Sequence, residues 1–210
     1  MSAARAGLRA RRFALCPELM VWAADEPVPL WEALERETGK REGPPFWGHA
    51  WPGSLALARW VMDQPSLVRA QQVLDFATGC GVSAIAAARA GASSVLATDI
   101  DLHAITACRE NAMLNGCSID AQHRDVVGLD EGWSVILVGD VFYEAQLSSR
   151  VFAWLERLAR RGATVLIGDP GRSFLPKEKL RCEATYPLDV VPAWDSVEDR
   201  PPRVWRVMGF

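Results

Sequence analysis

The sequence predicts an α/β fold, a mostly parallel, doubly wound sheet with a C-terminal antiparallel hairpin. Short apolar runs alternate along the chain with segments of helical periodicity, which is typical of parallel strands joined by helices. The strand-like runs are apolar on successive residues, as expected for strands that are covered on both faces. Near the C-terminus, two β-rich segments flank a polar turn and predict the hairpin.

Five segments predict the helices, because their apolar residues recur at helical spacing. Gly39, Gly91 and Gly116 stand where three of them end, and Pro65 follows a fourth, for which Ser54 is the expected N-cap. The segments are LWEALERETG (30–39), SLALARWVMDQ (54–64), VSAIAAARAG (82–91), LHAITACRENAMLNG (102–116) and AQLSSRVFAWLERLARRG (145–162).

Five apolar or β-rich runs predict the parallel strands, and two more predict the hairpin. The parallel strands are QVLDFA (72–77), SSVLATD (93–99), SIDAQH (118–123), WSVILVGD (133–140) and ATVLIGD (163–169). The hairpin strands are KLRCEATYPLDVV (179–191) and RVWRVMGF (203–210), joined by the turn at 192–202.

Length and composition exclude several classes of protein. The 210 residues carry a net charge of −3, and half of them are apolar, which favours one globular domain with a small extension and gives no case for a nucleic-acid partner. We place the extension, with a Trp-rich loop, at 1–50 and the main domain at 51–210. No apolar run is long enough to span a bilayer. The five cysteines form no C-x-x-C pair, so we expect neither a disulfide framework nor a zinc site. His49, His103 and His123 are scattered along the chain, so no metal site is expected. We also expect a monomer.

The N-terminus allows two interpretations. MSAARAGLRARR has four arginines and no acid, a composition also found in mitochondrial transit peptides, which would place the protein in the matrix. We favour a short basic arm on a bacterial cytoplasmic protein, because the following segment, CPELMVWAADEPVPLWEAL, already has a structured pattern.

The loop after the first parallel strand, VLDFATGCG (73–81), indicates the ligand. In such sheets ligands bind outside the carboxyl ends of the strands. Gly79 and Gly81 permit a tight turn and a close ligand approach, but the third glycine of a pyrophosphate loop is absent and Asp75 would repel a phosphate. Asp99 ends the next strand, where a carboxylate accepts hydrogen bonds from ribose hydroxyls. A ligand with a ribose, no phosphate and an ammonium group that suits Asp75 is S-adenosylmethionine.

Several of these residues also allow simpler interpretations. Asp125, after the third strand, is equally well explained as the former of an Asx turn. Cys80, within the glycine loop, is either a reactive thiol or, as we prefer, a small filler. GDPGR (168–172) is either a phosphate loop or, by default, a tight turn. Trp47 and Trp51 could simply anchor their loop to the core.

The segment VLDFATGCGVSAIAAARAGASSVLATDIDLHAITACRENAMLNG resembles the first half of a Rossmann-like seven-strand methyltransferase, whose glycine motif is D-x-G-x-G-x-G. PPFWGHAWPGSLALARWV, LVGDVFYE and LIGDPGR extend the resemblance to the family-16 protein lysine methyltransferases, from Glu18 to the C-terminus. The resemblance makes 51–210 the methyltransferase domain. Ala77 replaces the first glycine of the motif, and an alanine is tolerated there if its backbone keeps a negative φ.

The resemblance also implies the roles of individual residues. Asp99 would hold the ribose, Asp125 the adenine amine with help from Val126, and Trp51 one wall of the cleft. The residues at the methionine end of the cofactor would be Asp75, Ala77, Thr78, Gly79 and Gly81. Those at the point of methyl transfer would be Gly139, Asp140 and Tyr143, with Asp140 and Tyr143 as the catalytic pair.

The implied reaction is N-methylation of a protein lysine, for which the β-subunit of electron transfer flavoprotein is the expected substrate. Asp140 and Glu144 could hold the ammonium, and the aromatic faces of Tyr143, Phe142 or a Trp could contact the lysine stem. O-methylation would call for a base such as His. Three alternatives stay open: methylation of a ribosomal protein, methylation of a small amine such as nicotinamide, and a non-catalytic cofactor-binding module.

Overall fold

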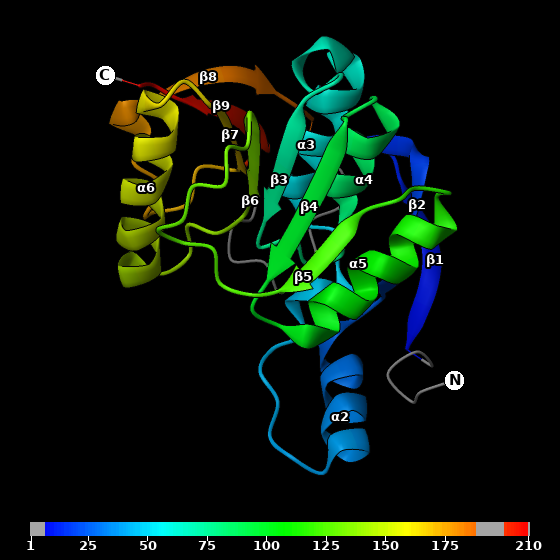
Figure 1. Cartoon of the computed structure of the whole chain (residues 1–210). Coiled ribbons are helices and arrows are strands. Elements are labelled where there is room, and N and C mark those ends of the chain that lie inside the picture. Colours follow the sequence, from blue (N-terminus) through cyan, green and yellow to red (C-terminus); the bar gives the residue numbers. More distant parts are fainter. Residues whose placement is uncertain (1–6, 188–199, 210) are drawn as a thin grey trace.

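The computed structural model, which describes residues 7–187 and 200–209, has a seven-stranded sheet in the order β5-β4-β3-β6-β7-β9-β8 (Figure 1). The first five strands in this order are parallel, and β9 runs antiparallel to both β7 and β8. The predicted fold class is therefore confirmed, including the terminal hairpin. The turn expected at 192–202 lies mostly outside the described residues.

The predicted strands and helices are present, most of them with small shifts at their ends. The strand predicted at 179–191 is shorter and ends at Thr185, and its last four positions, 188–191, lie outside the described residues. The strands of the large sheet are β3 (Gln72–Phe76), β4 (Ser94–Asp99), β5 (Asp120–His123), β6 (Val135–Gly139), β7 (Thr164–Asp169), β8 (Leu180–Thr185) and β9 (Arg203–Val207). The helices are α2 (Pro27–Thr38), α3 (Pro52–Asp63), α4 (Val82–Arg89), α5 (Leu102–Leu114) and α6 (Ala145–Arg160). Three short 3-10 turns lie at Phe46–Gly48, Pro65–Leu67 and Lys177–Lys179.

Helices cover both faces of the sheet, as the continuous apolar strands predict. Successive residues of β3 point to opposite faces, so Val73 joins the core under α3, α4 and α5, whereas Leu74 joins the core under α6 (Figure 1). Within the described residues, α6 carries the strongest apolar stripe, formed by Val151, Trp154, Leu155 and Leu158, all buried. None of the described helices is both long and apolar enough to cross a membrane.

An antiparallel hairpin of β1 (Leu8–Phe13) and β2 (Cys16–Ala24) precedes α2, and the sequence analysis assigned no strand there. In β2, buried and more exposed residues alternate over part of the strand, which is typical of a strand with one covered face, and Cys16, Leu19 and Val21 are buried. These three side chains join the core under α3 and α4. The N-terminal extension is thus continuous in packing with the rest of the chain.

The N-terminus of α3 docks directly against the ends of β6 and β7. A Cβ atom on Gly53 would lie 2.2 Å from the Gly168 carbonyl oxygen, and one on Gly139 would lie 2.1 Å from Ser54 Oγ. Only glycine permits this approach, because real Cβ contacts are never so short. The glycines at 53, 139 and 168 therefore bring the start of α3 onto the carboxyl edge of the sheet, beside Asp140.

The expectation that Ser54 caps α3 is wrong. The helix begins at Pro52, whose fixed φ suits the first helical position, and the N-cap residue is Trp51, whose side chain makes no capping hydrogen bond. Ser54 lies inside the first turn, and its amide donates to the Asp140 carboxylate at 2.9 Å. The cap comes from 86 residues away in the sequence, where local patterns give no signal.

Candidate active site

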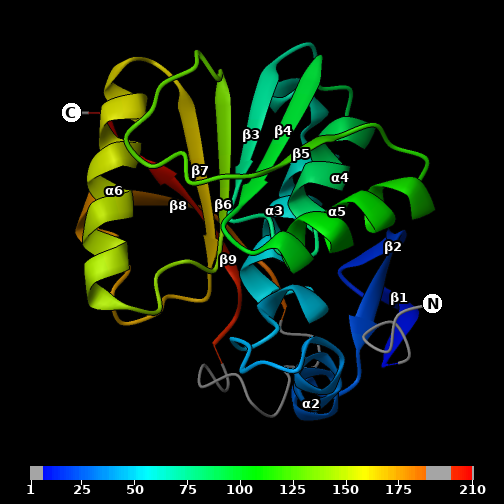
Figure 2. The ribbon, with the colours of Figure 1, turned by 60° about the horizontal axis from the view of Figure 1, so that its bottom comes forward.

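A cavity of about 510 Å³ opens at the carboxyl ends of β3, β4 and β6, within the size range of small-molecule sites. The glycine loop after β3 forms one side, and the loop 43–51, which follows α2, forms another. Figure 2 shows α2 and this loop below the ends at which β3 and β4 terminate. The predicted site residues that line the cavity are Trp51, Ala77, Thr78, Gly79, Asp99, Asp125, Gly139, Asp140 and Tyr143. Asp75, Gly81 and Val126 do not line it.

Asp75 lies behind the glycine loop and is 2% exposed. Its Oδ2 accepts a hydrogen bond from Thr78 Oγ1 at 2.5 Å, and the Ala84 amide also donates to this carboxylate. Burial raises the pKa of Asp75 from 3.8 to about 7, and the nearby Asp99 adds to the rise. Because Asp75 is outside the lining, the structure does not support a direct contact with a cofactor ammonium. Instead, Asp75 stabilises the glycine loop by accepting hydrogen bonds from the Thr78 hydroxyl and the Ala84 amide.

The glycine loop turns through three residues with positive φ, Ala77 at +52°, Gly79 at +52° and Gly81 at +83°. The negative φ under which an alanine is tolerated at this position is not met, so Ala77 occupies a left-handed conformation that costs about 1–2 kcal/mol. A Cβ on Gly79 would meet no atom within 4 Å, whereas one on Gly81 would lie 2.7 Å from Cys108 Sγ. Gly79 therefore keeps the cavity open, and Gly81 allows α4 to pack against α5.

Cys80, within this loop, is 3% exposed, and burial raises the pKa of its thiol to about 12. A thiol with so high a pKa is inert near neutral pH. The interpretation of Cys80 as a small filler is therefore favoured over the reactive thiol.

Asp99 ends β4 and faces the cavity beside Gly79. Its Oδ2 accepts from the Gly79 amide and its Oδ1 from the Asp101 amide, both at 3.0 Å. Burial raises the pKa of Asp99, and these amides oppose the rise. Asp99 thus stabilises the glycine loop as well as presenting a carboxylate to the cavity.

Asp125 makes the Asx turn that was one of its two interpretations. Its Oδ1 accepts from the Val127 amide at 2.9 Å, and its Oδ2 forms an ion pair with Arg150 at 2.9 Å. Asp125 also lines the cavity, so the turn does not exclude ligand contact. Val126 is fully buried in the core under α6, so its side chain offers no surface to a ligand.

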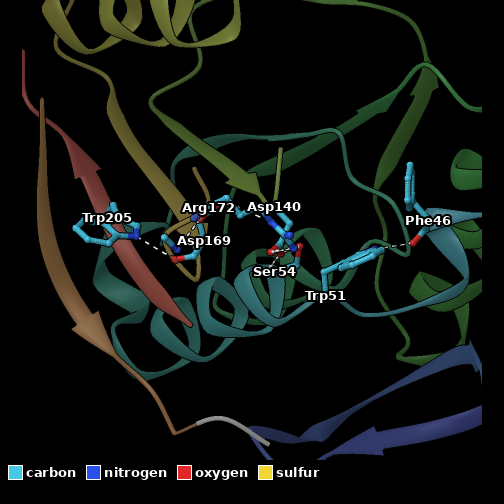
Figure 3. A network of polar contacts seen from close by, with 8 residues as sticks. Phe46, Trp51, Ser54, Asp140, Asp169, Arg172 and Trp205 are labelled. Atoms are coloured by element: carbon cyan, nitrogen blue, oxygen red, sulfur yellow. Dashed lines mark hydrogen bonds and ion pairs between the residues drawn. The ribbon is translucent and has the colours of Figure 1, made fainter. Parts of the chain in front are cut away.

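Asp140 follows β6 and has a φ of +55°, an uncommon conformation for a residue with a side chain. Its Oδ2 accepts from the Ser54 amide, and its Oδ1 lies 3.4 Å from Arg172 Nη2 (Figure 3). The Arg172 and Asp140 side chains are only 9% and 5% exposed. Asp140 therefore caps α3 and forms a buried ion pair while it lines the cavity.

The segment GDPGR forms the tight turn that was its default interpretation. Asp169 Oδ1 accepts from the amides of Gly171 and Arg172, each at 2.7 Å. The turn directs the Arg172 side chain toward Asp140 and the cavity (Figure 3). Arg172 was missed as a site residue because its partner Asp140 is 32 residues away.

Aromatic side chains form the mouth of the cavity. The Phe46 ring lies 5.7 Å from Trp51 and 5.9 Å from Tyr143, measured between centroids, and His49 lies 5.9 Å from Trp51. Phe46 and Tyr143 are about half exposed. Phe142 is fully buried in the core under α6, so the expectation that its face could contact a lysine stem is wrong. Within the same segment, Asp140, Val141 and Tyr143 line the cavity, whereas Phe142 does not.

Comparisons with known proteins agree with this geometry. Residues 58–138 match the model of the family described as ribosomal protein L11 methyltransferase (PrmA). The electron transfer flavoprotein beta subunit lysine methyltransferase of Xenopus laevis is 48% identical over 134 residues, which cover 62% of this chain and 54% of that protein. The chain spans about half the length of the curated relatives it matches.

Two solved structures share the fold. The ribosomal protein L11 methylase from Lactobacillus delbrueckii subsp. bulgaricus has a TM-score of 0.54 and 24% identity, covering 73% of this chain and 77% of that one. The magnesium protoporphyrin IX methyltransferase from Synechocystis PCC 6803 with bound SAM also has a TM-score of 0.54, at 17% identity, covering 74% of this chain and 77% of that one.

Sheet order and neighbours together define a Rossmann-like methyltransferase fold. Residues 58–138 are similar to the PrmA family, and proteins 37–48% identical to this chain over their matched segments include electron transfer flavoprotein beta subunit lysine methyltransferases.

Proposed function

We propose that the protein is an S-adenosylmethionine-dependent N-methyltransferase that modifies a lysine of a protein substrate. The observation that carries the proposal is the partly buried Asp99 carboxylate beside Gly79, where the glycine loop opens onto the cavity. This pairing offers an acceptor for a ribose and a backbone that a ligand can approach closely. The magnesium protoporphyrin IX methyltransferase from Synechocystis PCC 6803, which has the same fold, is known in a structure with bound SAM.

The residues of the cavity fit the parts of this cofactor. Asp99 would accept the ribose hydroxyls, and the loop at Thr78 and Gly79, which leads into α4, would receive the methionine carboxylate near the helix N-terminus. Ile100 is 74% exposed, follows Asp99 and lines the cavity, so it would cover one face of the adenine. Asp125 would accept the adenine amine. Ile100 was not among the predicted site residues, although an apolar residue between Asp99 and Asp101, directly after the end of a strand, could have indicated a ligand contact.

The chain's own residues would mainly align the incoming amine. S-adenosylmethionine supplies a methyl group that is already activated on a sulfonium. The substrate amine must first lose its proton, because lysine is cationic near neutral pH. Tyr143, Phe46 and Trp51 would exclude water and contact the apolar stem of the lysine. Asp140 would lie near the nitrogen, and its catalytic role, like that of Tyr143, stays a prediction.

A protein substrate is favoured by the open aromatic mouth and by the relatives. Proteins 37–48% identical to this chain over their matched segments are named for the β-subunit of electron transfer flavoprotein, and we propose that β-subunit as the substrate. We also propose a monomer that needs no nucleic acid, acting in a bacterial cytoplasm or, if residues 1–12 are a targeting sequence, in the mitochondrial matrix.

Transfer of a labelled methyl group tests the proposal. The protein is incubated with tritiated S-adenosylmethionine and either recombinant flavoprotein β-subunit or recombinant ribosomal protein L11, and labelled lysines are mapped by mass spectrometry. We expect label on a lysine of the flavoprotein subunit, and no label when Asp99→Ala replaces the wild type. Label on L11 alone would show that the substrate is ribosomal protein L11 and not the flavoprotein subunit. Absence of label on both proteins and on lysate, despite cofactor binding, would favour a non-catalytic module.

A further inference from the structure

Arg172 lines the cavity beside Asp140, and neither the fold nor the names of the relatives give it a role. Its guanidinium lies 3.4 Å from the Asp140 carboxylate and 5.8 Å from the centroid of the Trp51 ring. Asp169 lies behind it, with 3.9 Å between Asp169 Oδ2 and Arg172 Nε. All of these groups are seen together in Figure 3. A carboxylate and an aromatic face are the partners that also suit an alkylammonium.

The ion pair changes what Asp140 can do to a substrate. An isolated carboxylate in a nearly dry site would bind an ammonium strongly and hold its proton, which opposes nucleophilic attack. A guanidinium beside the carboxylate cancels most of that field. The guanidinium itself cannot lose its proton at working pH, so the compensation is permanent.

Of the two carboxylates that pair with Arg172, Asp140 lines the cavity and Asp169 does not. Asp169 faces Arg172 from the end of β7 and is fully buried; its Oδ1 accepts two amides of its own turn, and its Oδ2 lies 3.9 Å from Arg172 Nε, farther than the 3.4 Å between Arg172 and Asp140. Lys177 and Arg203 approach Gly171, and the Arg200 guanidinium donates to the Gly171 carbonyl. These three cations belong to the outer side of the turn and do not line the cavity. Glu144 is exposed beyond Tyr143.

We propose that Arg172 is a positioning residue that compensates the charge of Asp140, so that the bound lysine ammonium gives up its proton to solvent water at the open mouth of the cavity near neutral pH, and the neutral nitrogen can then take the methyl group. This rests on the proposed lysine methylation. Arg172 also fixes the carboxylate on the α3 N-terminus, with the Ser54 amide on its other oxygen. The methyl-transfer end of the cavity thereby selects an amine that arrives neutral or becomes so easily.

The pH dependence of turnover tests this. Arg172→Gln removes the charge, Arg172→Lys keeps it, and Arg203→Gln is the matched control, because Arg203 lies 5.8 Å from the Trp205 ring in the same way but outside the cavity. For the flavoprotein β-subunit, we expect the midpoint of the rise in kcat with pH to move up by about one unit or more in Arg172→Gln. It should stay near the wild-type value in Arg172→Lys and Arg203→Gln. Equal midpoints in wild type and Arg172→Gln would overturn the inference.

A binding measurement separates this inference from the substrate assignment. n-Butylamine, a lysine side-chain analogue, is titrated by NMR into each variant saturated with S-adenosylhomocysteine at pH 7. Arg172→Gln should bind it about tenfold more tightly than wild type, because Asp140 is uncompensated. Equal amine affinity, or a large loss of S-adenosylhomocysteine affinity in Arg172→Gln, would overturn the role and place Arg172 in structure or cofactor binding. If the wild type methylates no flavoprotein subunit, the proposed function fails while this titration still decides the inference.

Discussion

The buried carboxyl of Asp75 predicts that stability depends on pH in an unusual direction. Its pKa is raised from 3.8 to about 7 by burial, and each unit corresponds to about 1.4 kcal/mol. In the unfolded chain Asp75 loses its proton near pH 4, whereas in the folded protein it keeps it up to about pH 7. Between these values the folded state binds more protons, so the free energy of unfolding falls as pH rises. The loss from this group amounts to at most about 4 kcal/mol and is complete above its folded pKa.

The comparison of wild type with Asp75→Asn isolates this contribution. Asn has nearly the same shape as Asp and can accept a hydrogen bond from the Ala84 amide. It can also donate to the Thr78 hydroxyl, which can then direct its own proton toward Cys108 Sγ, 3.8 Å away. Urea unfolding followed by tryptophan fluorescence gives the free energy of unfolding at pH 4.5, 6 and 8. We expect wild type to lose about 3–4 kcal/mol relative to the variant across this range.

Asp120→Asn serves as the control, because Asp120 is an exposed carboxyl at the start of β5. Its difference from wild type should stay nearly constant over the same pH range. A difference between wild type and Asp75→Asn that does not change with pH would refute the reasoning, since it would mean that Asp75 titrates alike in the folded and unfolded chains.

Further predictions concern residues of the cavity and of the glycine loop. Asp99→Ala should weaken S-adenosylhomocysteine binding by about 2–3 kcal/mol in calorimetry and also lower the melting temperature, because it removes the acceptor for two amides; unchanged affinity in a folded variant would remove Asp99 from the site. Gly81→Ala should destabilise the fold by about 2–4 kcal/mol in urea, since it adds backbone strain and a clash with Cys108. Gly79→Ala should cost only the strain but lose most cofactor affinity; equal behaviour of the two glycine variants would contradict their separate roles. Asp140→Asn should lower both the methylation rate and, by about 1–2 kcal/mol, the free energy of unfolding, while cofactor affinity stays within about threefold; full activity would exclude Asp140 from the mechanism.

Most of the fold was predictable because its signals are local. Continuous apolar runs such as 133–140 and the amphipathic stripe of 145–162 specify strand and helix without knowledge of their neighbours. The β1–β2 hairpin was missed, because its outer strand is polar and exposed over most of its length and the alternation in β2 is incomplete. Packing against α5, through hydrogen bonds from Met20 and Trp22 to Asn115 and Asn111, supports it instead.

The site was predictable where a residue's place in the sheet determines its surroundings. Asp99 and Gly79 meet at the cavity because parallel strands end at the same edge. Burial could not be read in this way, so Asp75 was expected in the lining but lies behind it. The partners of Asp140 were also beyond local patterns, because Ser54 and Arg172 reach it from α3 and from the turn after β7.

The central claim is that the cleft takes S-adenosylmethionine and not a dinucleotide, and a calorimetric titration tests it directly. S-adenosylhomocysteine and NAD are titrated separately into the wild-type protein under the same conditions. The account predicts saturable binding of one S-adenosylhomocysteine per chain and no measurable heat with NAD, because the glycine loop lacks the third glycine that a pyrophosphate loop has. Binding of NAD with similar affinity, or no binding of S-adenosylhomocysteine, would contradict it.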